Sequence, residues 1–132
     1  MTLRSTVQDT AGRQKLCQRG HALLEKEKEG WRLRYSAKDE AGGRSGGDIR
    51  LHGGTVMMRS MTGGYTLELD PGRTTALCLG EGGSRLVLDI ETRRACWDLT
   101  GTDEGRIELD YAMLSAGEIV SEISLQMLLR KK

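Results

Sequence analysis

The sequence predicts an all-β protein built as a closed antiparallel meander barrel of about eight to ten strands. Three observations carry this prediction. Apolar and polar residues alternate in short runs between residues 31 and 129, which is typical of strands with one buried face. Turn signals, many of them drawn from the 18 Gly, separate these runs. No segment of the sequence shows a sustained helical period.

The first strands are predicted from residues 2–8 and 14–28. Residues 2–8 alternate, with Leu3 and Val7 on one face. Residues 14–28 include the run EKEKE, whose composition favours a helix. Gly20 and the all-β remainder of the chain favour a strand with a bulge or bend at Gly20 instead. Whether this segment forms one strand or two stays open.

The following strands each end at a turn. A glycine-rich stretch at residues 41–47 is predicted to be the most flexible loop, and Gly53 with Gly54 suits a two-residue hairpin loop. Residues 62–64, 70–72, 80–83 and 115–118 are predicted turns, and 98–104 a polar connection. The predicted strands are residues 31–36, 48–52, 55–61, 65–69, 73–79, 85–97, 106–114 and 119–129. Their short connections predict an up-and-down order, and barrel closure removes the exposed sheet edges.

The composition limits the core and the partners. With no Phe, two Trp and three Tyr, the core must consist largely of leucine and methionine. A formal net charge of +1 gives no field that attracts polyanions, so nucleic acid is a disfavoured partner. The one basic concentration is a stripe that forms if its strands adjoin, and Trp31 and Tyr35 are expected to point inward, away from it. The stripe consists of Arg32, Arg34, Lys38, Arg44 and Arg50.

The cysteines and the absence of long apolar runs predict a cytoplasmic protein. Cys17, Cys78 and Cys96 are odd in number and widely spaced, which favours free thiols in a reducing compartment. The first residues lack the pattern of a signal peptide, and the sequence has no apolar stretch of membrane-spanning length. We therefore expect no membrane partner.

Arg59 is the first candidate binding residue. It lies beside Met57 and Met58 in an otherwise apolar strand, and a guanidinium in a dry barrel needs anionic partners. It would anchor an acidic ligand headgroup, with Trp31 and Tyr111 supplying apolar contact. The alternative is a structural ion pair with Asp89 or Glu91, or plain exposure to solvent.

Catalytic and metal sites are not indicated, so we expect neither an enzyme nor a cofactor. His21 and Cys17 are too far apart along a strand to ligate one ion. Neither His21 nor His52 has a nucleophile at a recognisable spacing. Cys96 is expected to be buried and inert, and Cys78 to fill space between leucines. Glu108 and Asp110 are expected on the outer face.

Four short motifs resemble the YwiB-like proteins, a bacterial family of unknown function. The motifs are residues 56–60 (VMMRS), 86–88 (LVL) leading to Thr92, 105–111 (GRIELDY) and 121–125 (SEISL). The resemblance covers roughly the last three quarters of the chain, and Leu77-Cys78-Leu79 stands where relatives tend to have a tyrosine. It implies a calycin-like, lipocalin-type barrel whose interior holds one small ligand.

These observations together predict one calycin-like domain over residues 1–132. The expected function is non-enzymatic binding of a small molecule inside the barrel. The alternative is a protein- or RNA-interaction module with a filled core and a functional exterior. The sequence does not indicate an oligomeric state.

Overall fold

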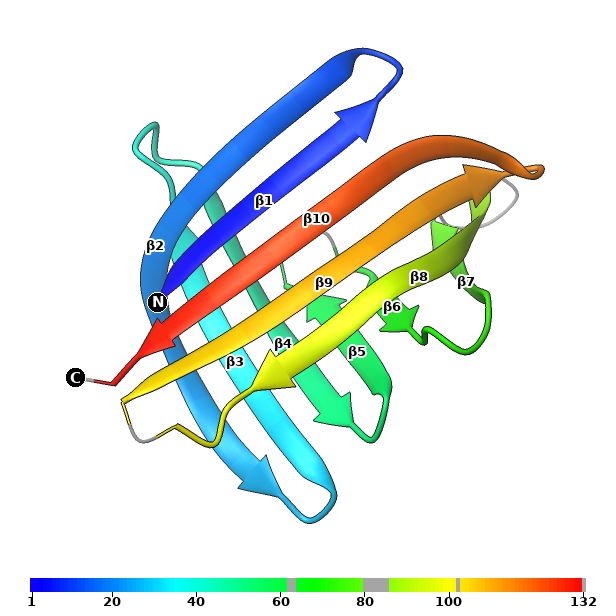
Figure 1. Ribbon diagram of the computed structural model, residues 1–132. Coiled ribbons are helices and arrows are strands. Elements are labelled where there is room, and N and C mark those ends of the chain that lie inside the picture. The colour runs from blue at the N-terminus through cyan, green and yellow to red at the C-terminus, as the bar shows by residue number, and fades with distance from the viewer. Residues whose placement is uncertain (62–63, 80–85, 102, 132) are drawn as a thin grey trace.

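Ten antiparallel strands form one sheet in the computed structural model, which describes residues 1–61, 64–79, 86–101 and 103–131 (Figure 1). The all-β prediction is therefore confirmed. The strands are β1 (Thr2–Asp9), β2 (Gly12–Glu27), β3 (Gly30–Lys38), β4 (Arg44–His52), β5 (Thr55–Ser60), β6 (Thr66–Leu69), β7 (Thr75–Leu79), β8 (Leu86–Asp98), β9 (Glu104–Ser115) and β10 (Glu118–Arg130).

The sheet is a meander that curls into a nearly closed barrel. Its strand order is β6-β5-β4-β3-β2-β1-β10-β9-β8-β7. Strands that follow one another in the sequence are therefore paired, as predicted, except for β6 and β7. The first and last strands pair along their length, from Thr2 opposite Leu128 to Asp9 opposite Ser121. The incomplete seam of the barrel consequently lies in the middle of the chain.

Short strands flank this seam. The turn at residues 70–72 separates β6, with four residues, from β7, with five. The described residues form no ladder between them, but the Thr75 hydroxyl donates a hydrogen bond of 2.6 Å to the Glu68 carbonyl oxygen. Such short edges offer few unpaired backbone groups to other chains.

Strand β2 is one continuous strand that changes partners halfway. Its first half pairs with β1 up to Arg19, and its second half pairs with β3 from Arg19 onward. Gly20 lies at this change, where an added Cβ would stand 1.9 Å from the Ser36 carbonyl oxygen. The glycine therefore permits the close approach of β3. Residues 14–27 thus belong to one strand and not to two. The predicted bulge is absent from this register.

The barrel interior is filled mainly by leucine and isoleucine. Strand alternation turns one face of each strand inward, and the residues on that face form a continuous cluster. Met127 is fully buried, and Met58 and Met113 pack against the cluster. The largest fully buried side chains are Leu33, Ile49, Leu51, Leu67, Leu69, Ile90, Ile107, Leu109, Met127 and Val56.

The prediction of a flexible loop over residues 41–47 is wrong at its end, because β4 already begins at Arg44. Gly47 pairs with Tyr35 on β3, and a Cβ on Gly47 would lie 2.9 Å from the Tyr35 ring. The glycine thus makes room for an inward-facing ring. The turn at residues 80–83 and most of the turn at 62–64 lie outside the described residues.

Candidate functional site

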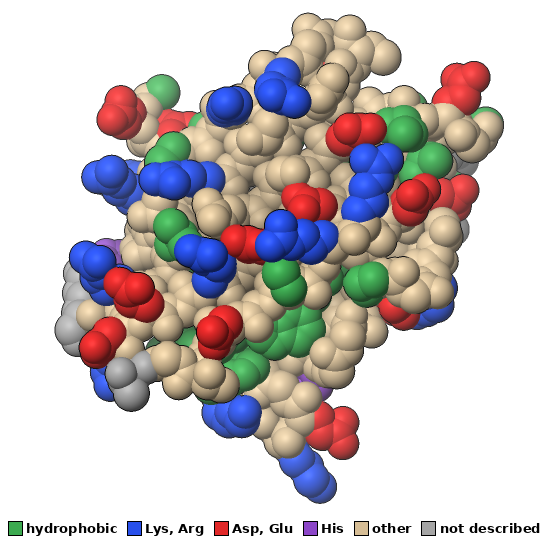
Figure 2. Space-filling model, in the orientation of Figure 1, with side chains coloured by type: hydrophobic (Ala, Val, Ile, Leu, Met, Phe, Trp, Pro, Cys, Tyr) green, Lys and Arg blue, Asp and Glu red, His purple; other side chains and the backbone are tan. Residues whose placement is uncertain are grey.

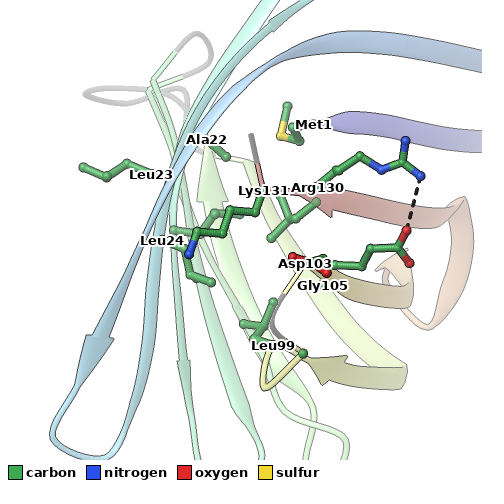
Figure 3. A pocket seen from close by; sticks show the side chains of 13 residues that line it. Met1, Ala22, Leu23, Leu24, Leu99, Asp103, Gly105, Arg130 and Lys131 are labelled. Atoms are coloured by element: carbon green, nitrogen blue, oxygen red, sulfur yellow. Dashed lines mark hydrogen bonds and ion pairs between the residues drawn. The ribbon is translucent and has the colours of Figure 1, made fainter.

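The barrel wall has an opening between β2 and β10. Strand β1 begins at Thr2, opposite Arg19, whereas β2 continues to Glu27. The second half of β2 therefore has no partner on the side of β1 among the described strands. A cavity of about 470 Å³ occupies this gap, bordered by β2, by the connection between β8 and β9, and by the end of β10 (Figure 3).

The floor and walls of this cavity are apolar. Leu33 is fully buried at the floor, and Leu99 is nearly so. Leu24 and Leu99 approach the cavity from opposite sides, whereas the Leu23 side chain points away from it (Figure 3). Apolar pockets of about 300–1,000 Å³ are typical of small-molecule sites. The apolar residues that border the cavity with side chain or backbone are Met1, Ala22, Leu23, Leu24, Leu33, Leu99 and Leu129.

Charged side chains surround the mouth. Arg130 forms an ion pair of 3.2 Å with Glu104, and both side chains are largely exposed. The Lys131 backbone N–H donates to the Asp103 carbonyl oxygen at 2.8 Å, which holds the end of β10 against the connection between β8 and β9. The Lys131 side chain extends across the mouth toward Leu24 (Figure 3). It forms no ion pair within the described part of the chain, so it is available to an anion.

Unpaired backbone groups of β2 also border the cavity. Gly20 and Met1 exchange two backbone hydrogen bonds of 3.1 Å, so the Gly20 N–H and C=O point toward β1. Backbone groups of alternate residues point the same way in an antiparallel ladder. Ala22 and Leu24 therefore direct their N–H and C=O groups into the gap, where a ligand with polar atoms can bond to them.

None of the three predicted binding residues lines this cavity. Arg59, considered as an anchor in a dry interior with exposure to solvent as the alternative, is exposed. Val56 is buried and Met58 packs on the core, so alternation turns Arg59 outward. It lies opposite Asp48 in the ladder, but the Asp48 carboxylate is bonded to Arg32, and the described residues give Arg59 no ion pair. Its role in ligand binding stays a prediction.

Trp31 and Tyr111 face inward, as expected, and contact the core. Trp31 is half-buried, with the Lys26 ammonium 4.4 Å from its ring centroid. Tyr111 is buried, and this burial raises the pKa of its phenol; Tyr65 and Tyr35 raise it further. Tyr111 pairs with Thr92, whose buried hydroxyl has no hydrogen-bond partner among the described residues. Both rings thus belong to the packed interior and not to the opening.

The predicted basic stripe is partly neutralised. Arg32 binds the Asp48 carboxylate at 2.6 Å, and this hydrogen bond holds the pKa of Asp48 below its usual value. Arg34 forms an ion pair with Glu25. Arg50 lies opposite Arg32 in the ladder and forms no ion pair among the described residues. The stripe therefore offers less positive charge than its sequence indicates.

The outer face formed by β1, β10 and β9 carries interspersed charges of both signs (Figure 2). Glu108 lies there as predicted, with Arg94 and Arg106 as ion-pair partners, and Asp110 accepts a hydrogen bond from Ser124. Cys96, expected to be buried, is exposed beside Arg94 because alternation turns its neighbour Trp97 inward. The Cys78 side chain lies outside the described part of the structure.

The residues around the opening were missed because no motif marks them. One signal was available, since the second predicted strand (residues 14–28) is about twice as long as the first (residues 2–8). A long strand beside a short one leaves part of its edge unpaired. Arg59 was predicted instead because the ligand was expected in the centre of the barrel.

Comparisons with known proteins support the fold alone. No family model and no curated protein matches the sequence. The crystal structure of the YwiB protein from Bacillus subtilis is similar, with a TM-score of 0.73 and 15% sequence identity over 99% of this chain and 89% of that chain. A de novo designed fluorescence-activating β-barrel gives a TM-score of 0.40 and 12% identity over 98% of this chain and 91% of that chain. The described residues contain no helix long and apolar enough to cross a membrane.

Proposed function

We propose that this chain is a binding protein that holds a small anionic ligand with an apolar body in the opening between β2 and β10. The observation that carries the proposal is the cavity of about 470 Å³ with a leucine floor and, at its mouth, the Lys131 ammonium, which forms no ion pair among the described residues. Burial of a ligand's apolar body stabilises the complex by about 25 cal/mol per Å² removed from water. A charge at the mouth then orients the ligand.

Each side chain has a defined part in this proposal. Leu33 and Leu99 form the floor that contacts the apolar body. The Lys131 ammonium meets the anionic group at the mouth, and the backbone of Ala22 and Leu24 bonds to further polar atoms. Trp31 and Tyr111 contribute by packing the interior, since neither lines the opening.

We also infer membership of the YwiB-like family, with its calycin-type barrel, and a cytoplasmic location. The inference of family is supported by the likeness of fold and by the four motifs described above. The inference of location is supported by the free thiols of Cys17 and Cys96, which stay reduced in a reducing compartment.

A dye titration tests the proposal. The probe is 8-anilinonaphthalene-1-sulfonate, an anionic aromatic molecule, and we expect saturable one-to-one binding seen as enhanced fluorescence. In the variant Ala22→Trp the indole fills the cavity, so we expect at least tenfold weaker binding. His21→Trp is the matched control, because His21 is the preceding residue and lies on the opposite face of β2. It should bind the dye as the parent does.

A second variant tests the role of charge. Lys131→Gln removes the ammonium from the mouth, and we expect several-fold weaker dye binding with unchanged thermal stability, because this side chain is exposed. Native mass spectrometry of protein purified without denaturation should show a bound mass that Ala22→Trp lacks. Equal dye affinity in Ala22→Trp and His21→Trp would overturn the proposal.

A further inference from the structure

The first half of β2 has a free edge. Residues 12–18 pair with β1 on one side, whereas pairing with β3 begins at Arg19 on the other. Figure 1 shows this half of β2 projecting from the barrel together with β1. The Gln18 side chain donates to the Gly43 carbonyl and accepts from the Ser45 hydroxyl, so Gly43 and the start of β4 cover the edge there. Residues 12–17 are left without a second neighbouring strand in the described structure.

The direction of the backbone groups along this edge follows from the pair formed by Met1 and Gly20. Because Gly20 points its N–H and C=O toward β1, the odd-numbered residues of β2 point theirs away from it. At Arg19 those groups meet β3. At Arg13, Lys15 and Cys17 they meet no other described strand, and all three residues are exposed. The edge therefore presents a row of backbone hydrogen-bond donors and acceptors with the spacing of a β-sheet ladder.

The edge is cationic on one face and carries one exposed leucine on the other. Residues 2–19 contain four cationic side chains, Arg4, Arg13, Lys15 and Arg19, against one anionic side chain, Asp9. None of the four forms an ion pair among the described residues. On the opposite face Leu16 is 43% exposed, although it lies on the face that includes the buried Leu3. The chain as a whole has a net charge of only +1, so this excess is local.

We propose that residues 12–17 bind an extended acidic peptide segment of another protein by strand addition. Backbone hydrogen bonds to Arg13, Lys15 and Cys17 supply affinity, as in other cases where a peptide extends a sheet. Acidic side chains at alternate positions of the peptide face Arg13 and Lys15. Apolar side chains between them cover Leu16.

The charge of the edge disfavours a second copy of this chain as the partner. Two copies paired through residues 12–17 would place Arg13 and Lys15 of one copy among the same cations of the other. Like charges opposite one another destabilise a ladder. Lysine on an edge strand is a common protection against such self-association. An acidic segment reverses the sign of this interaction, which makes it the better occupant.

A labelled peptide with the sequence EVETEVE tests the proposal by fluorescence anisotropy. We expect saturable binding that weakens as salt is added, because the charges are exposed. A peptide with the sequence KVKTKVK should not bind. Two further EVETEVE peptides are N-methylated at alternate residues, one at the odd and one at the even positions, so that each has lost one row of its backbone N–H donors. We expect at least tenfold weaker binding for the peptide whose methylated row faces β2 and unchanged binding for the other.

Two variants at one position separate charge from backbone. Lys15→Ala and Lys15→Pro both lose the ammonium, but only Lys15→Pro also loses the N–H that points to the partner. Proline is tolerated at an edge position whose N–H is not used by the sheet. We expect several-fold weaker peptide binding in Lys15→Ala and a further tenfold loss in Lys15→Pro. Circular dichroism and thermal melting report whether each variant is folded.

Several outcomes would overturn the proposal. Equal binding by Lys15→Ala and Lys15→Pro, or equal binding of both N-methylated forms of the peptide, would show that the backbone edge is not used. Loss of peptide binding in Ala22→Trp would place the peptide in the cavity instead. A dimer seen in sedimentation velocity experiments that Lys15→Pro dissociates would make a second copy the occupant. The N-methylated peptides keep the test decisive if Lys15→Pro fails to fold.

Discussion

Two buried threonines differ in one hydrogen bond. Thr75 and Thr92 are 6% and 7% exposed. The Thr75 hydroxyl donates to the Glu68 carbonyl across the seam, whereas the Thr92 hydroxyl has no partner in the described structure. A buried polar group without a hydrogen bond costs about 1–3 kcal/mol relative to one that is satisfied. The same residue type therefore has opposite effects at two positions of one barrel.

Replacement by valine, which keeps the shape and removes the hydroxyl, should reveal this difference. We expect Thr92→Val to raise the free energy of unfolding by about 1 kcal/mol, because the orphan hydroxyl disappears. We expect Thr75→Val to lower it by about 1 kcal/mol, because the Glu68 carbonyl loses its donor. Urea titrations followed by tryptophan fluorescence measure both changes. A loss of stability in Thr92→Val would mean that a bound water satisfies its hydroxyl.

Arg59 and Cys96 show that residue type alone does not determine which face of a strand a side chain occupies. Arg59 was considered for the interior, with exposure as the alternative, because its neighbours Met57 and Met58 are apolar, yet Met57 is itself 39% exposed. Two adjacent apolar residues do not reveal which of them faces inward. Cys96 was placed inside because cysteine is commonly buried, although Trp97 takes the inward position. Residue type indicates a tendency, whereas the phase of the strand decides the face.

At the scale of the strand, β2 depends on close backbone approach at Gly20. The neighbouring strand lies so near that a Cβ would stand 1.9 Å from the Ser36 carbonyl oxygen and 2.7 Å from the Ala37 Cα. Both contacts are with backbone atoms, which no side-chain rotation relieves. Gly54, in the turn before β5, provides the contrast, since a Cβ there would meet nothing within 4 Å.

Alanine substitution at these two glycines should therefore give different results. We expect Gly20→Ala to lower the free energy of unfolding by more than about 2 kcal/mol, because β3 must move away from β2. Gly54→Ala should change stability by less than about 1 kcal/mol. Chemical denaturation of both variants gives the comparison. Equal stability of the two variants would show that β2 and β3 separate here without cost.

Strand existence was predictable, and strand boundaries were less so. Alternation located most of the ten strands, because a buried face imposes a period of two on a strand, whereas the strand at residues 14–28 was inferred from Gly20 and the all-β remainder of the chain. The start of β4 was missed because its glycines look like a loop, while Gly47 in fact accommodates the Tyr35 ring. The helical propensity of EKEKE did not prevent residues 12–27 from forming β2. Pairing with two partners outweighs local preference there.

At the scale of the molecule, the barrel is closed by its two ends. Strand β1 pairs with β10, and both termini lie at the same end of this pair (Figure 1). The remaining seam separates β6 from β7, which are consecutive in the sequence. Short connections predict that consecutive strands pair. They do not reveal which junction stays open, because that depends on the lengths of β6 and β7 in the finished barrel.

This arrangement predicts the behaviour of a circular permutant. Joining the termini through a Gly-Ser linker and opening the chain between Gly72 and Arg73 gives the order β7 to β10 followed by β1 to β6. Every pair of consecutive strands is then a hydrogen-bonded pair. The contact between β1 and β10, distant in the natural order, becomes local. We expect the permutant to keep the fold, with stability within about 2 kcal/mol of the parent, and to refold faster because its contacts are more local.

A second permutant with the same linker, opened between Gly53 and Gly54, is the control. It cuts the hairpin that joins β4 to β5, so one local ladder becomes a pairing of the two chain ends. Closing that long loop costs entropy, and a permutant opened there should be less stable and refold more slowly than the one opened at the seam. Circular dichroism and stopped-flow refolding compare the two. Faster refolding of the control would mean that the ladder between β4 and β5 forms late and does not limit assembly of the barrel.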